Sequence, residues 1–470
     1  MTSTATHPLR FMARTTIEFE TPFIIGTGGD DLFFDDVFVA DGNGLPALPG
    51  SSLAGILRHA WAESGRGEGN ELFGWQDGDK GHGSRLSVSW GCIHDSANRP
   101  VEGIVYDRKR LDDPVLAEAR TLSWRDHVRI DHKGTAADKG KFDERSVSAG
   151  HRFTFELLLE GTSEDQGAWN NLLSLLRSDA VRIGGKTRRG YGQFKVIKLL
   201  SGVFDLATDE GFSAFCAHPV ALADPCDLPE RLAEITPHGG EEAVSASLQL
   251  KPESFWMIGG GVDSEVDMAP LKANRIVWEN GKGQVKDNQV IVPGSAVKGA
   301  ISHRVAYHYN RLTGTFAGKD VNPEDHSGEN NPAVRALFGF CKNSKDGKNE
   351  GQRGRVIISD LFVTEPETQK IINHVSIDRF TGGARVLEGA LFDEKPFYGG
   401  PGFALDVVVT QPDKIEDAKI RRALAAALDD LAQGRLAIGA GAGRGNGYFR
   451  ADGGVRWDEN GMKWIAGGVQ

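Results

Sequence analysis

The sequence lacks the features of a membrane or secreted protein. It contains no run of eighteen apolar residues, so we expect no membrane-spanning helix. Residues 1–10 lack the apolar stretch of a signal peptide. Cysteine is scarce and scattered, which excludes a disulfide framework; the four residues are Cys92, Cys216, Cys226 and Cys341. We therefore expect a reduced, cytoplasmic protein with no membrane partner.

The sequence also lacks an excess of positive charge, because its formal net charge is −11. This balance counts against a generic nucleic-acid binder, which is usually basic. The charge is unevenly spread, however. Residues 201–243 hold nine acidic residues and a single basic one, Arg231, whereas residues 181–196 hold five basic residues and no acidic one. Global charge therefore decides little about the partner.

The most prominent feature of the sequence is a repeated segment. Residues 48–59 (LPGSSLAGILRH) recur at 292–303 (VPGSAVKGAISH). Pro-Gly ends a strand, and we expect the following serine to cap a helix by accepting a bond from a backbone amide. Gly55 and Gly299 lie inside this helix, where glycine destabilises by roughly 1 kcal/mol relative to alanine. Because this cost occurs in both copies, we expect another backbone, from protein or ligand, to come close. Apolar residues at helical spacing predict one buried face: Leu53, Ile56, Leu57, Ala60 and Trp61.

Other landmarks occur twice and in the same order, offset by roughly 230–270 residues. A glycine-ended apolar strand opens each copy, and an apolar helix followed by a glycine-rich basic loop closes it. The paired segments are 23–29 and 256–261, 72–75 and 337–340, 85–88 and 355–358, 127–131 and 374–378, 142–144 and 392–394, and finally the loops 183–192 and 438–447. We conclude that the chain is an internal duplication.

The coarse order of elements predicts the fold class. Each copy is predicted to run strand, helix, strand, strand, helix, strand, which is the ferredoxin-like split βαβ pattern. We predict an α+β protein with two tandem ferredoxin-like, RRM-like domains and loop insertions. The first domain is expected at 1–200, an acidic linker or small lobe at 201–245, and the second domain at 246–470. The charged segment 112–142 should leave the sheet, whereas the alternating segment 153–157 predicts a strand.

These motifs resemble the RAMP superfamily, and more narrowly the backbone subunits of type III CRISPR effector complexes. The resemblance rests on the glycine-ended strand, Leu-Pro-x-Leu-Pro-Gly-Ser-Ser-Leu-x-Gly, Leu-Phe-Gly, His-Val-x-Ile-Asp and the closing Gly-Arg-Gly loop. It covers residues 10–200 and 246–455. The Pro-Gly-Ser-Ser-Leu and Gly-Arg-Gly motifs together are specific for this family, whereas either motif alone would be weak evidence for it. A tandem fusion resembles the arrangement in type III-D-like systems.

The resemblance implies a protein that grips guide RNA and stacks with other effector subunits into a filament. Many members also cut the guide-paired target RNA with an aspartate between the first strand and the Pro-Gly-Ser helix. Asp35 matches that place best and Asp36 is the second choice. In the second copy, one alignment puts Asn274 there, and Asp267 fits only if the intervening loop is longer.

Such cleavage needs a hard cation, which implies Mg²⁺ or Mn²⁺ held by Asp35 together with RNA phosphates. Asp30, Asp31, Asp35 and Asp36 form a local acidic cluster. Without the resemblance, this cluster is most simply a solvated acidic loop.

Candidate RNA contacts gather in the glycine-rich loops and at the helix starts. Free amides at a helix start favour a phosphate, and a loop with cations, glycines and a tyrosine suits phosphates and a stacked base. Taken singly, each motif is also typical of an ordinary turn or surface charge. The candidates are Ser51, Ser52, Arg58, His127, Lys186, Arg188, Arg189, Gly190 and Tyr191, and, in the second copy, Ser295, Lys298, His374, Arg444 and Gly445.

Two further kinds of chemistry stay open. His127 and His374 could serve as a general base for metal-free RNA cleavage, although no catalytic partner is evident and we expect them to shape a segment that touches RNA. Cys216, His218 and Cys226 could hold Zn²⁺, although their irregular spacing favours a structural role. The alternative functions are a non-catalytic guide-RNA scaffold and a guide-processing endoribonuclease.

Overall fold

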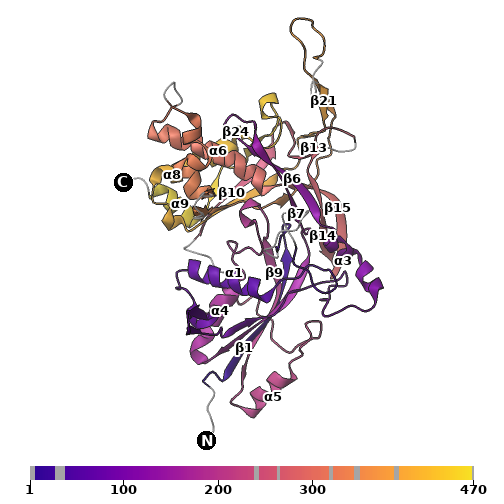
Figure 1. The fold of residues 1–470 in the computed structure, drawn as a ribbon, viewed down its shortest axis with the longest axis vertical. Helices are drawn as coiled ribbons and strands as arrows, with labels where there is room; N and C mark the ends of the chain where they lie inside the picture. Colours follow the sequence, from indigo (N-terminus) through magenta and orange to yellow (C-terminus); the bar gives the residue numbers. More distant parts are fainter. Residues whose placement is uncertain are drawn as a thin grey trace.

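The protein is described by a computed structural model over residues 6–26, 38–237, 243–261, 265–316, 321–342, 350–385 and 391–467. Figure 1 shows two halves stacked along the longest axis, with the first half, indigo to magenta, below the second half, orange to yellow. None of the described helices is both long and apolar enough to cross a membrane.

The first half is built on an antiparallel sheet with the strand order β4-β8-β1-β9. Two helices, α1 (Gly50–Glu63) and α4 (Gln166–Leu175), contribute their apolar faces to its core. The predicted buried face of α1 is confirmed, since Leu53, Leu57, Ala60 and Trp61 are buried and Ile56 packs against them. The strands are β1 (Leu9–Phe19), β4 (Leu86–Val88), β8 (Arg152–Gly161) and β9 (Phe194–Asp205), and β5 (Cys92–Ile93) also pairs with β8.

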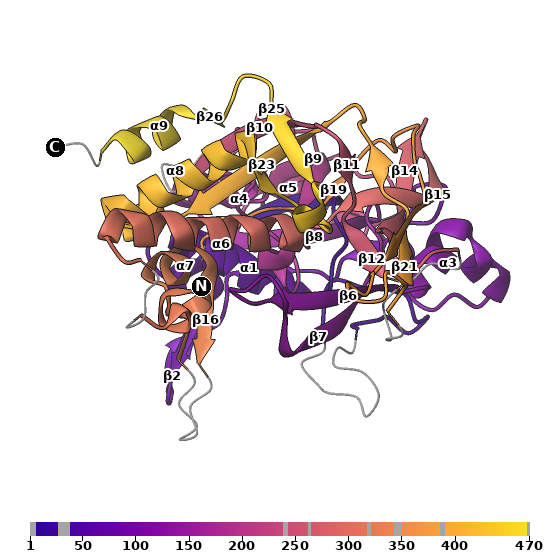
Figure 2. The ribbon, with the colours of Figure 1, turned by 90° about the horizontal axis from the view of Figure 1, so that it is seen from above.

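The second half repeats this order, which confirms the predicted duplication. Its sheet runs β18-β23-β10-β25-β24, and β26 also pairs with β10. Figure 2 shows the helices α6 (Gly294–Thr313) and α8 (Ala418–Ala432) side by side over this sheet, with α9 (Glu459–Ala466) beyond them. The strands are β10 (Ala243–Pro252), β18 (Val356–Ile357), β23 (Phe403–Thr410), β24 (Gln433–Ala437), β25 (Tyr448–Ala451) and β26 (Arg456–Trp457).

Each half extends hairpins away from its sheet. The predicted departure of the charged segment after residue 112 is confirmed by α3 (Pro114–Arg120) and the hairpin β6–β7. The hairpin strands are β2 (Trp75–Asp77) with β3 (Lys80–His82), β6 (Ser123–Ile130) with β7 (Ala136–Ser146), β16 (Gly339–Lys342) with β17 (Glu350–Arg353), and β20 (Ile372–Val375) with β21 (Leu391–Glu394). The remaining short elements are α2 (Asn70–Phe73), α7 (Pro332–Phe338), β11 (Phe255–Trp256), β12 (Gly259–Gly261), β13 (Ala269–Pro270), β19 (Leu361–Phe362) and β22 (Phe397–Tyr398).

A long hairpin of the second half, β14 (Lys272–Glu279) with β15 (Lys282–Val292), packs on the first half. The Ile276 amide donates to the Ala149 carbonyl at 2.8 Å. The Trp278 indole donates to the Gly150 carbonyl at 2.7 Å, and the Arg152 guanidinium lies 4.2 Å from the Trp278 ring centroid. A Cβ at Gly150 would lie 2.0 Å from the Ile276 carbonyl oxygen, so this close contact requires glycine.

The acidic segment between the halves packs against the first sheet. Strand β9 continues to Asp205, and α5 (Asp209–Ala217) follows it. The Arg14 guanidinium, which is buried, donates to the carbonyls of Pro219 and Asp224, each at 2.7 Å. Arg14 therefore anchors residues 219–224 of this segment to the sheet. The division of the chain at 200 and 245 stays a prediction.

The starts of α1 and α6 differ from the expectation. No side chain of the helix itself caps either one, because the helices begin at glycine and the cap residues are Pro49 and Pro293. A Cβ at Gly50 would lie 2.1 Å from the Val88 carbonyl oxygen, and at Gly294 2.2 Å from that of Ile358. The close backbone approach therefore occurs at these two glycines. The expectation for Gly55 and Gly299 is wrong for protein backbone, since no described atom lies within 4 Å of a Cβ built there.

Candidate nucleic-acid interface

The first glycine-rich loop, residues 183–192 and hereafter loop 1, lies against the start of α6 in the other half. The Arg188 guanidinium donates through Nε to the Gly354 carbonyl at 2.7 Å. The Lys298 ammonium donates to the Arg188 carbonyl at 3.0 Å. Arg353 donates to the Thr187 hydroxyl at 3.2 Å. Loop 1 and the second Pro-Gly-Ser helix, both predicted RNA contacts, thus bind each other.

Asp360 lies at the centre of this contact, although it is not among the residues predicted from the sequence. Its Oδ2 lies 2.6 Å from Arg125 Nη1 on β6, and its Oδ1 accepts a 2.8 Å bond from the Gly294 amide at the start of α6. Its own amide donates to the Gly190 carbonyl at 3.1 Å. A Cβ at Gly190, where φ is +110°, would lie 2.1 Å from Asp360 Oδ1. Asp360 therefore caps the helix that serine was expected to cap.

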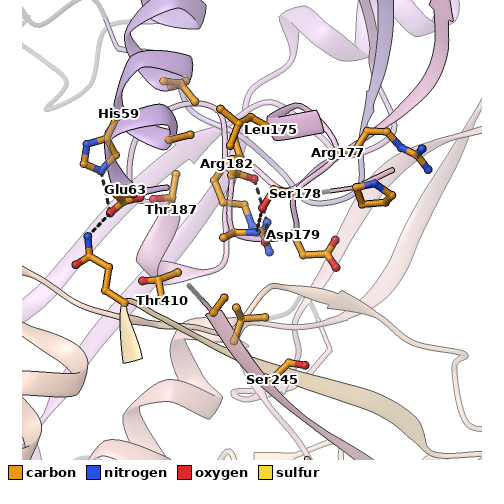
Figure 3. Close-up of a pocket in the computed structure, with 18 of the residues that line it drawn as sticks. His59, Glu63, Leu175, Arg177, Ser178, Asp179, Arg182, Thr187, Ser245 and Thr410 are labelled. Atoms are coloured by element: carbon orange, nitrogen blue, oxygen red, sulfur yellow. Dashed lines mark hydrogen bonds and ion pairs between the residues drawn. The ribbon is translucent and has the colours of Figure 1, made fainter. Parts of the chain in front are cut away.

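A cavity of about 840 Å³ lies beside this contact, between the halves. Figure 3 shows His59 and Glu63 projecting from α1 on one side, Arg182 from the turn after α4, and Ser245 and Thr410 from the second sheet. His59 Nε2 is 3.2 Å from Glu63 Oε1 and 2.9 Å from Arg353 Nη1. The cavity wall therefore combines both halves.

Three cations near this cavity, Arg182, Arg188 and Lys298, have lowered pKa values. Burial lowers the pKa of Arg182 to about 10. Burial, followed by the charges of Arg353 and Arg182, lowers the pKa of Arg188 to about 9. Burial and the neighbouring arginines lower the pKa of Lys298 to about 8. Arg182 Nε and Arg188 Nη1 are buried and lack a hydrogen-bond partner among the described residues. All three pKa values stay above 7, so these cations remain charged at neutral pH, beside the acids that line the cavity, Glu63, Asp179, Asp458 and Glu459.

Four residues form a cluster at the base of the hairpin β6–β7, here called the first hairpin cluster: His127, Phe142, Glu144 and Arg189. The His127 and Phe142 rings stack with centroids 5.1 Å apart, and the Arg189 guanidinium lies 4.8 Å from the Phe142 centroid. Glu144 is fully buried; it lies 3.1 Å from His127 Nε2 and forms an ion pair with Arg189. Although burial alone would raise it, His127, Arg189 and Lys186 together lower the pKa of Glu144 to about 2.

The second half repeats this arrangement in the second hairpin cluster: His374, Phe392, Glu394 and Arg444. The His374 and Phe392 rings stack at 4.7 Å, and the Arg444 guanidinium lies 5.3 Å from the Phe392 centroid. Glu394 Oε1 is 2.9 Å from His374 Nε2, and Oε2 is 2.6 Å from Arg444 Nη2. Each cluster therefore fixes the arginine of a glycine-rich loop against a hairpin.

These clusters explain the paired sequence words, because the histidine, the Phe-Asp-Glu segment and the loop arginine meet in each half. The exposed fraction of the arginine side chain is 43% for Arg189 and 38% for Arg444, so both can also reach a ligand. His127 and His374 are each held by a buried glutamate and a ring, which suits a positioning role.

The predicted acids fall partly outside the described residues. Asp35 and Asp36, with Asp30 and Asp31, lie outside them, so the predicted metal ligand Asp35 is not described. Asp267 is exposed, and its carboxylate accepts a 3.1 Å bond from the Asp393 amide next to the second hairpin cluster.

Backbone pairing decides between Asn274 and Asp267 as the counterpart of Asp35. The Val39 amide donates to the Ile25 carbonyl, and the Leu271 amide donates to the Ile258 carbonyl, both at 2.8 Å. These equivalent bonds make Asp35 and Asp267 the residues four positions before the two donors. Asn274 instead lies on β14, where it donates to Glu118 at 3.2 Å. The alignment that placed Asn274 opposite Asp35 is therefore wrong, and the β14–β15 hairpin supplies the longer intervening segment.

The other predicted contacts are distributed over the same region. Ser51 is exposed, Ser52 lines the cavity, Ser295 is half-buried at the start of α6, and Arg58 donates to Asn70 at 2.9 Å. Tyr191 is fully buried with the Arg125 guanidinium 5.0 Å from its ring centroid, so the expectation that it stacks on a base is not met. Residues 442–445 of the second glycine-rich loop, by contrast, are exposed. That loop, residues 438–447, is hereafter loop 2.

The described residues contain no group of three or more His, Cys, Asp or Glu side chains arranged for a metal ion. His218 of the suggested zinc set instead lies 3.1 Å from Glu156 Oε1, beside Arg14. The described ranges thus give no support to the zinc alternative.

Several residues of this interface escaped the sequence analysis, chiefly Arg125, Arg182, Arg353 and Asp360. One signal was present. Asp360 lies two positions after the Arg-led segment 355–358, and the first copy has Trp90 at the equivalent place after 85–88. When two paired segments differ in charge at one position, as here at Asp360 and Trp90, that position can mark a contact that one copy makes and the other does not.

Comparison with known proteins agrees with this duplicated architecture. The family model of the RAMP superfamily matches residues 16–195 and 249–450, which is most of the chain, and the chain belongs to this superfamily. One solved structure that matches is a chain described as type III-B Cmr-beta, a cryo-EM structure of the apo state. It is 16% identical, with a TM-score of 0.30, over 40% of this chain and 96% of that chain. A comparison with curated proteins finds no match.

Proposed function

We propose that this chain is a backbone subunit of a type III CRISPR ribonucleoprotein, with two tandem ferredoxin-like halves that bind guide RNA. The strand orders β4-β8-β1-β9 and β18-β23-β10-β25, each with two helices in the core, support the ferredoxin-like assignment. The RAMP superfamily match over both halves supports the class. Other effector subunits are its expected partners, and the cytoplasm its expected compartment.

The observation that carries RNA binding is the repeated hairpin cluster. Each half holds one half-exposed arginine, Arg189 or Arg444, at the junction of a hairpin and a glycine-rich loop. Phosphate contacts from arginine position an RNA without reading its sequence, and base pairing to the guide then supplies specificity. Two such arginines in tandem suit a ribose-phosphate chain that runs along both halves.

Arg189→Ala and Arg444→Ala test this assignment. Each should weaken binding of a single-stranded guide about tenfold and lower the slope of log affinity against log salt by roughly 0.7, the value for one phosphate contact. Arg231→Ala, on the acidic segment, is the matched control and should leave both quantities unchanged. Equal binding by all three variants would contradict the proposal. Sequencing of RNA copurified from native cells should return repeat-derived guides.

Target RNA cleavage is assigned to an acid between the first strand of each half and its Pro-Gly-Ser helix: Asp35, with Asp36 as the second choice, in the first half and Asp267 in the second. The equivalent backbone bonds of Val39 and Leu271 support this pairing. Mg²⁺ or Mn²⁺, held by the acid and RNA phosphates, would polarise the scissile phosphate.

Cleavage assays in the assembled complex separate the two acids. Asp35→Asn should abolish one cut in the target RNA and Asp267→Asn another, while Asp36→Asn tests the second choice at the first position. Asp413→Asn, an exposed acid in the loop before α8, serves as the control. If the wild-type complex binds target RNA but does not cut it, the chain acts only as a non-catalytic scaffold. Cutting that persists in chelator would contradict the metal-dependent assignment.

A further inference from the structure

A groove of about 840 Å³ lies on the first half. Its walls come from α4, α5, residues 201–204 of β9 and the segment 227–235. Apart from α4, these segments lie outside the ranges that match the RAMP superfamily. The proposed function therefore does not account for the groove.

The two sheets show which part of the second half is equivalent to the groove. The register of the two glycine-ended strand segments makes Ala246 of β10 the counterpart of Ala13 of β1. Ala13 pairs with Ser201 of β9, and Ala246 pairs with Trp457 of β26. Ser201, at the start of the groove, is thus equivalent to Trp457, which lies shortly before α9.

The second half covers this place with a helix of its own. After Trp457 the chain turns into α9, which packs on α8 (Figure 1). Trp464 of α9 is buried, and its indole donates to the Pro412 carbonyl at 3.0 Å. In the first half, β9 instead continues to Asp205, and α5, which has no buried residue, follows at the lower end of the molecule (Figure 1). The groove therefore lies where the second half has a helix with an aromatic anchor.

The groove offers apolar surface to such a helix. Trp169, Leu173 and Ile235 line it and belong to the core of the first half. Val203, which also lines it, is 45% exposed, although its cross-strand partner Phe11 is buried. Directly opposed residues point to the same face of a sheet, so Val203 lies on the face that α4 covers. A further helix beside α4 would remove Val203 from water.

The unpaired charges of the groove are negative. Glu210 of α5 and Asp227 line it, and within the described ranges neither carboxylate has an ion-pair or hydrogen-bond partner. Arg231, the basic residue of the lining, lies 2.7 Å from Glu234. The described segment 201–237 carries seven acidic residues and this one arginine. The charge therefore favours a basic occupant.

We propose that this groove docks an amphipathic helix of a partner protein, which places an aromatic side chain over Val203 and lysine or arginine beside Glu210 and Asp227. Amphipathic helices bind grooves through such anchors, and aromatic residues and arginine are frequent anchors of interfaces. The α9 helix of a second copy suits the groove poorly, because Asp458 and Glu459 lie at its start.

Fluorescence anisotropy of a labelled peptide with RNA-free, full-length protein tests the proposal. The probe is a peptide of about 14 residues, built of alanine and lysine around one tryptophan, which is long enough to form a helix when bound. It should bind with a Kd of about 10–100 µM. Replacing its tryptophan by alanine, or its lysines by glutamate, should each weaken binding at least about tenfold.

Variants of the groove give the matched test. Ala214→Trp places a bulky side chain in the groove and should weaken binding of the probe at least about tenfold. Ser213→Trp, at an exposed neighbour that does not line the groove, is its control. Glu210→Lys and Asp227→Lys should also weaken binding at least about tenfold, whereas Asp209→Lys, at an exposed acid outside the lining, should stay within about threefold of the wild type.

Three results would overturn the proposal. The first is equal binding of the three peptides, and the second is an Ala214→Trp variant that binds the probe as tightly as Ser213→Trp does. The third is self-association of the wild type in sedimentation velocity that Ala214→Trp abolishes, which would assign the groove to a second copy. Thermal unfolding shows that each variant retains the fold, since all the substituted positions are exposed. The assays contain no RNA, so their failure and the failure of the proposed function are distinguishable.

Discussion

Arg125 Nη1 lies 2.6 Å from Asp360 Oδ2, and the two residues are 235 positions apart. The pair joins the β6–β7 hairpin of the first half to the start of α6 in the second. Burial alone would lower the pKa of Arg125, yet Asp360 raises it above its usual value. The pair is therefore charged and buried, which makes each residue dependent on the other.

Asp360→Ala should lower the free energy of unfolding by about 3–5 kcal/mol, the range for removing one partner of a buried ion pair. It also removes the acceptor for the Gly294 amide. Denaturant unfolding at pH 7 measures the loss. Arg125→Met/Asp360→Leu should recover a large part of it, and Trp90→Ala at the counterpart position should change stability by less than about 1 kcal/mol. A loss below that limit for Asp360→Ala would be the contrary result.

Gly55→Ala and Gly299→Ala should each raise the free energy of unfolding by up to about 1 kcal/mol, because alanine favours a helix and the structure leaves room for its Cβ. Gly50→Ala, which would meet the Val88 carbonyl, is the opposite case and should destabilise. Guide-RNA affinity measured on the same proteins shows whether RNA backbone approaches these helices, since a ligand there would make the stabilised variants weaker binders. A destabilised Gly55→Ala would count against the described packing.

Lys298 should make stability rise with pH. Its pKa is about 8 in the folded protein and 10.5 as its ordinary value, so the unfolded chain holds more protons between pH 8 and 10.5. Stability therefore increases as pH climbs through this window. At about 1.4 kcal/mol per pKa unit, the wild type should gain up to about 3 kcal/mol relative to Lys298→Met. Unfolding curves recorded at pH 7.5 and 10 test this, and parallel behaviour of the two proteins would refute it.

Glu144 should also make stability rise with pH, but in the acid range. Its pKa of about 2 lies below the ordinary 4.5, so its ion pairs stabilise the protein fully above pH 4.5. That stabilisation is lost as pH falls through 2. The Glu144→Gln variant should have a lower free energy of unfolding than the wild type at pH 7, by about 3 kcal/mol at most. Its free energy of unfolding should also change less between pH 4.5 and 2. Glu160→Gln, at a surface ion pair, is the matched control, and thermal unfolding across this range is the measurement.

The repeat, the strand of residues 153–157 and the apolar faces of α1, α4 and α8 could be predicted because each follows from local periodicity. The helix caps could not, since the serines sit one position beyond glycine residues that already start the helices. The cap of α6 comes from Asp360, which is 66 residues from Gly294, and no local pattern encodes that pairing.

The candidate site was predictable in its parts and not in its assembly. Paired words in the sequence identified His127, Phe142 and Glu144, and the structure adds that they meet Arg189. The counterpart of Asp35 was misaligned because residues 276–278 share the β-branched and aromatic character of 37–39, while the inserted hairpin follows Asp267 rather than preceding it. The burial of Tyr191 depends on Arg125 and Asp360, both distant in sequence.

The β14–β15 hairpin has a consequence for the continuity of the chain. It bonds to Ala149 and Gly150 of the first half, whereas Asp360 bonds to Arg125 and Gly190, so two sets of contacts join the halves. The connecting peptide then mainly raises the effective concentration of one half near the other, while the contacts between the halves hold them together. A polypeptide nicked between the halves should remain a single particle, and the halves made as separate polypeptides should find each other.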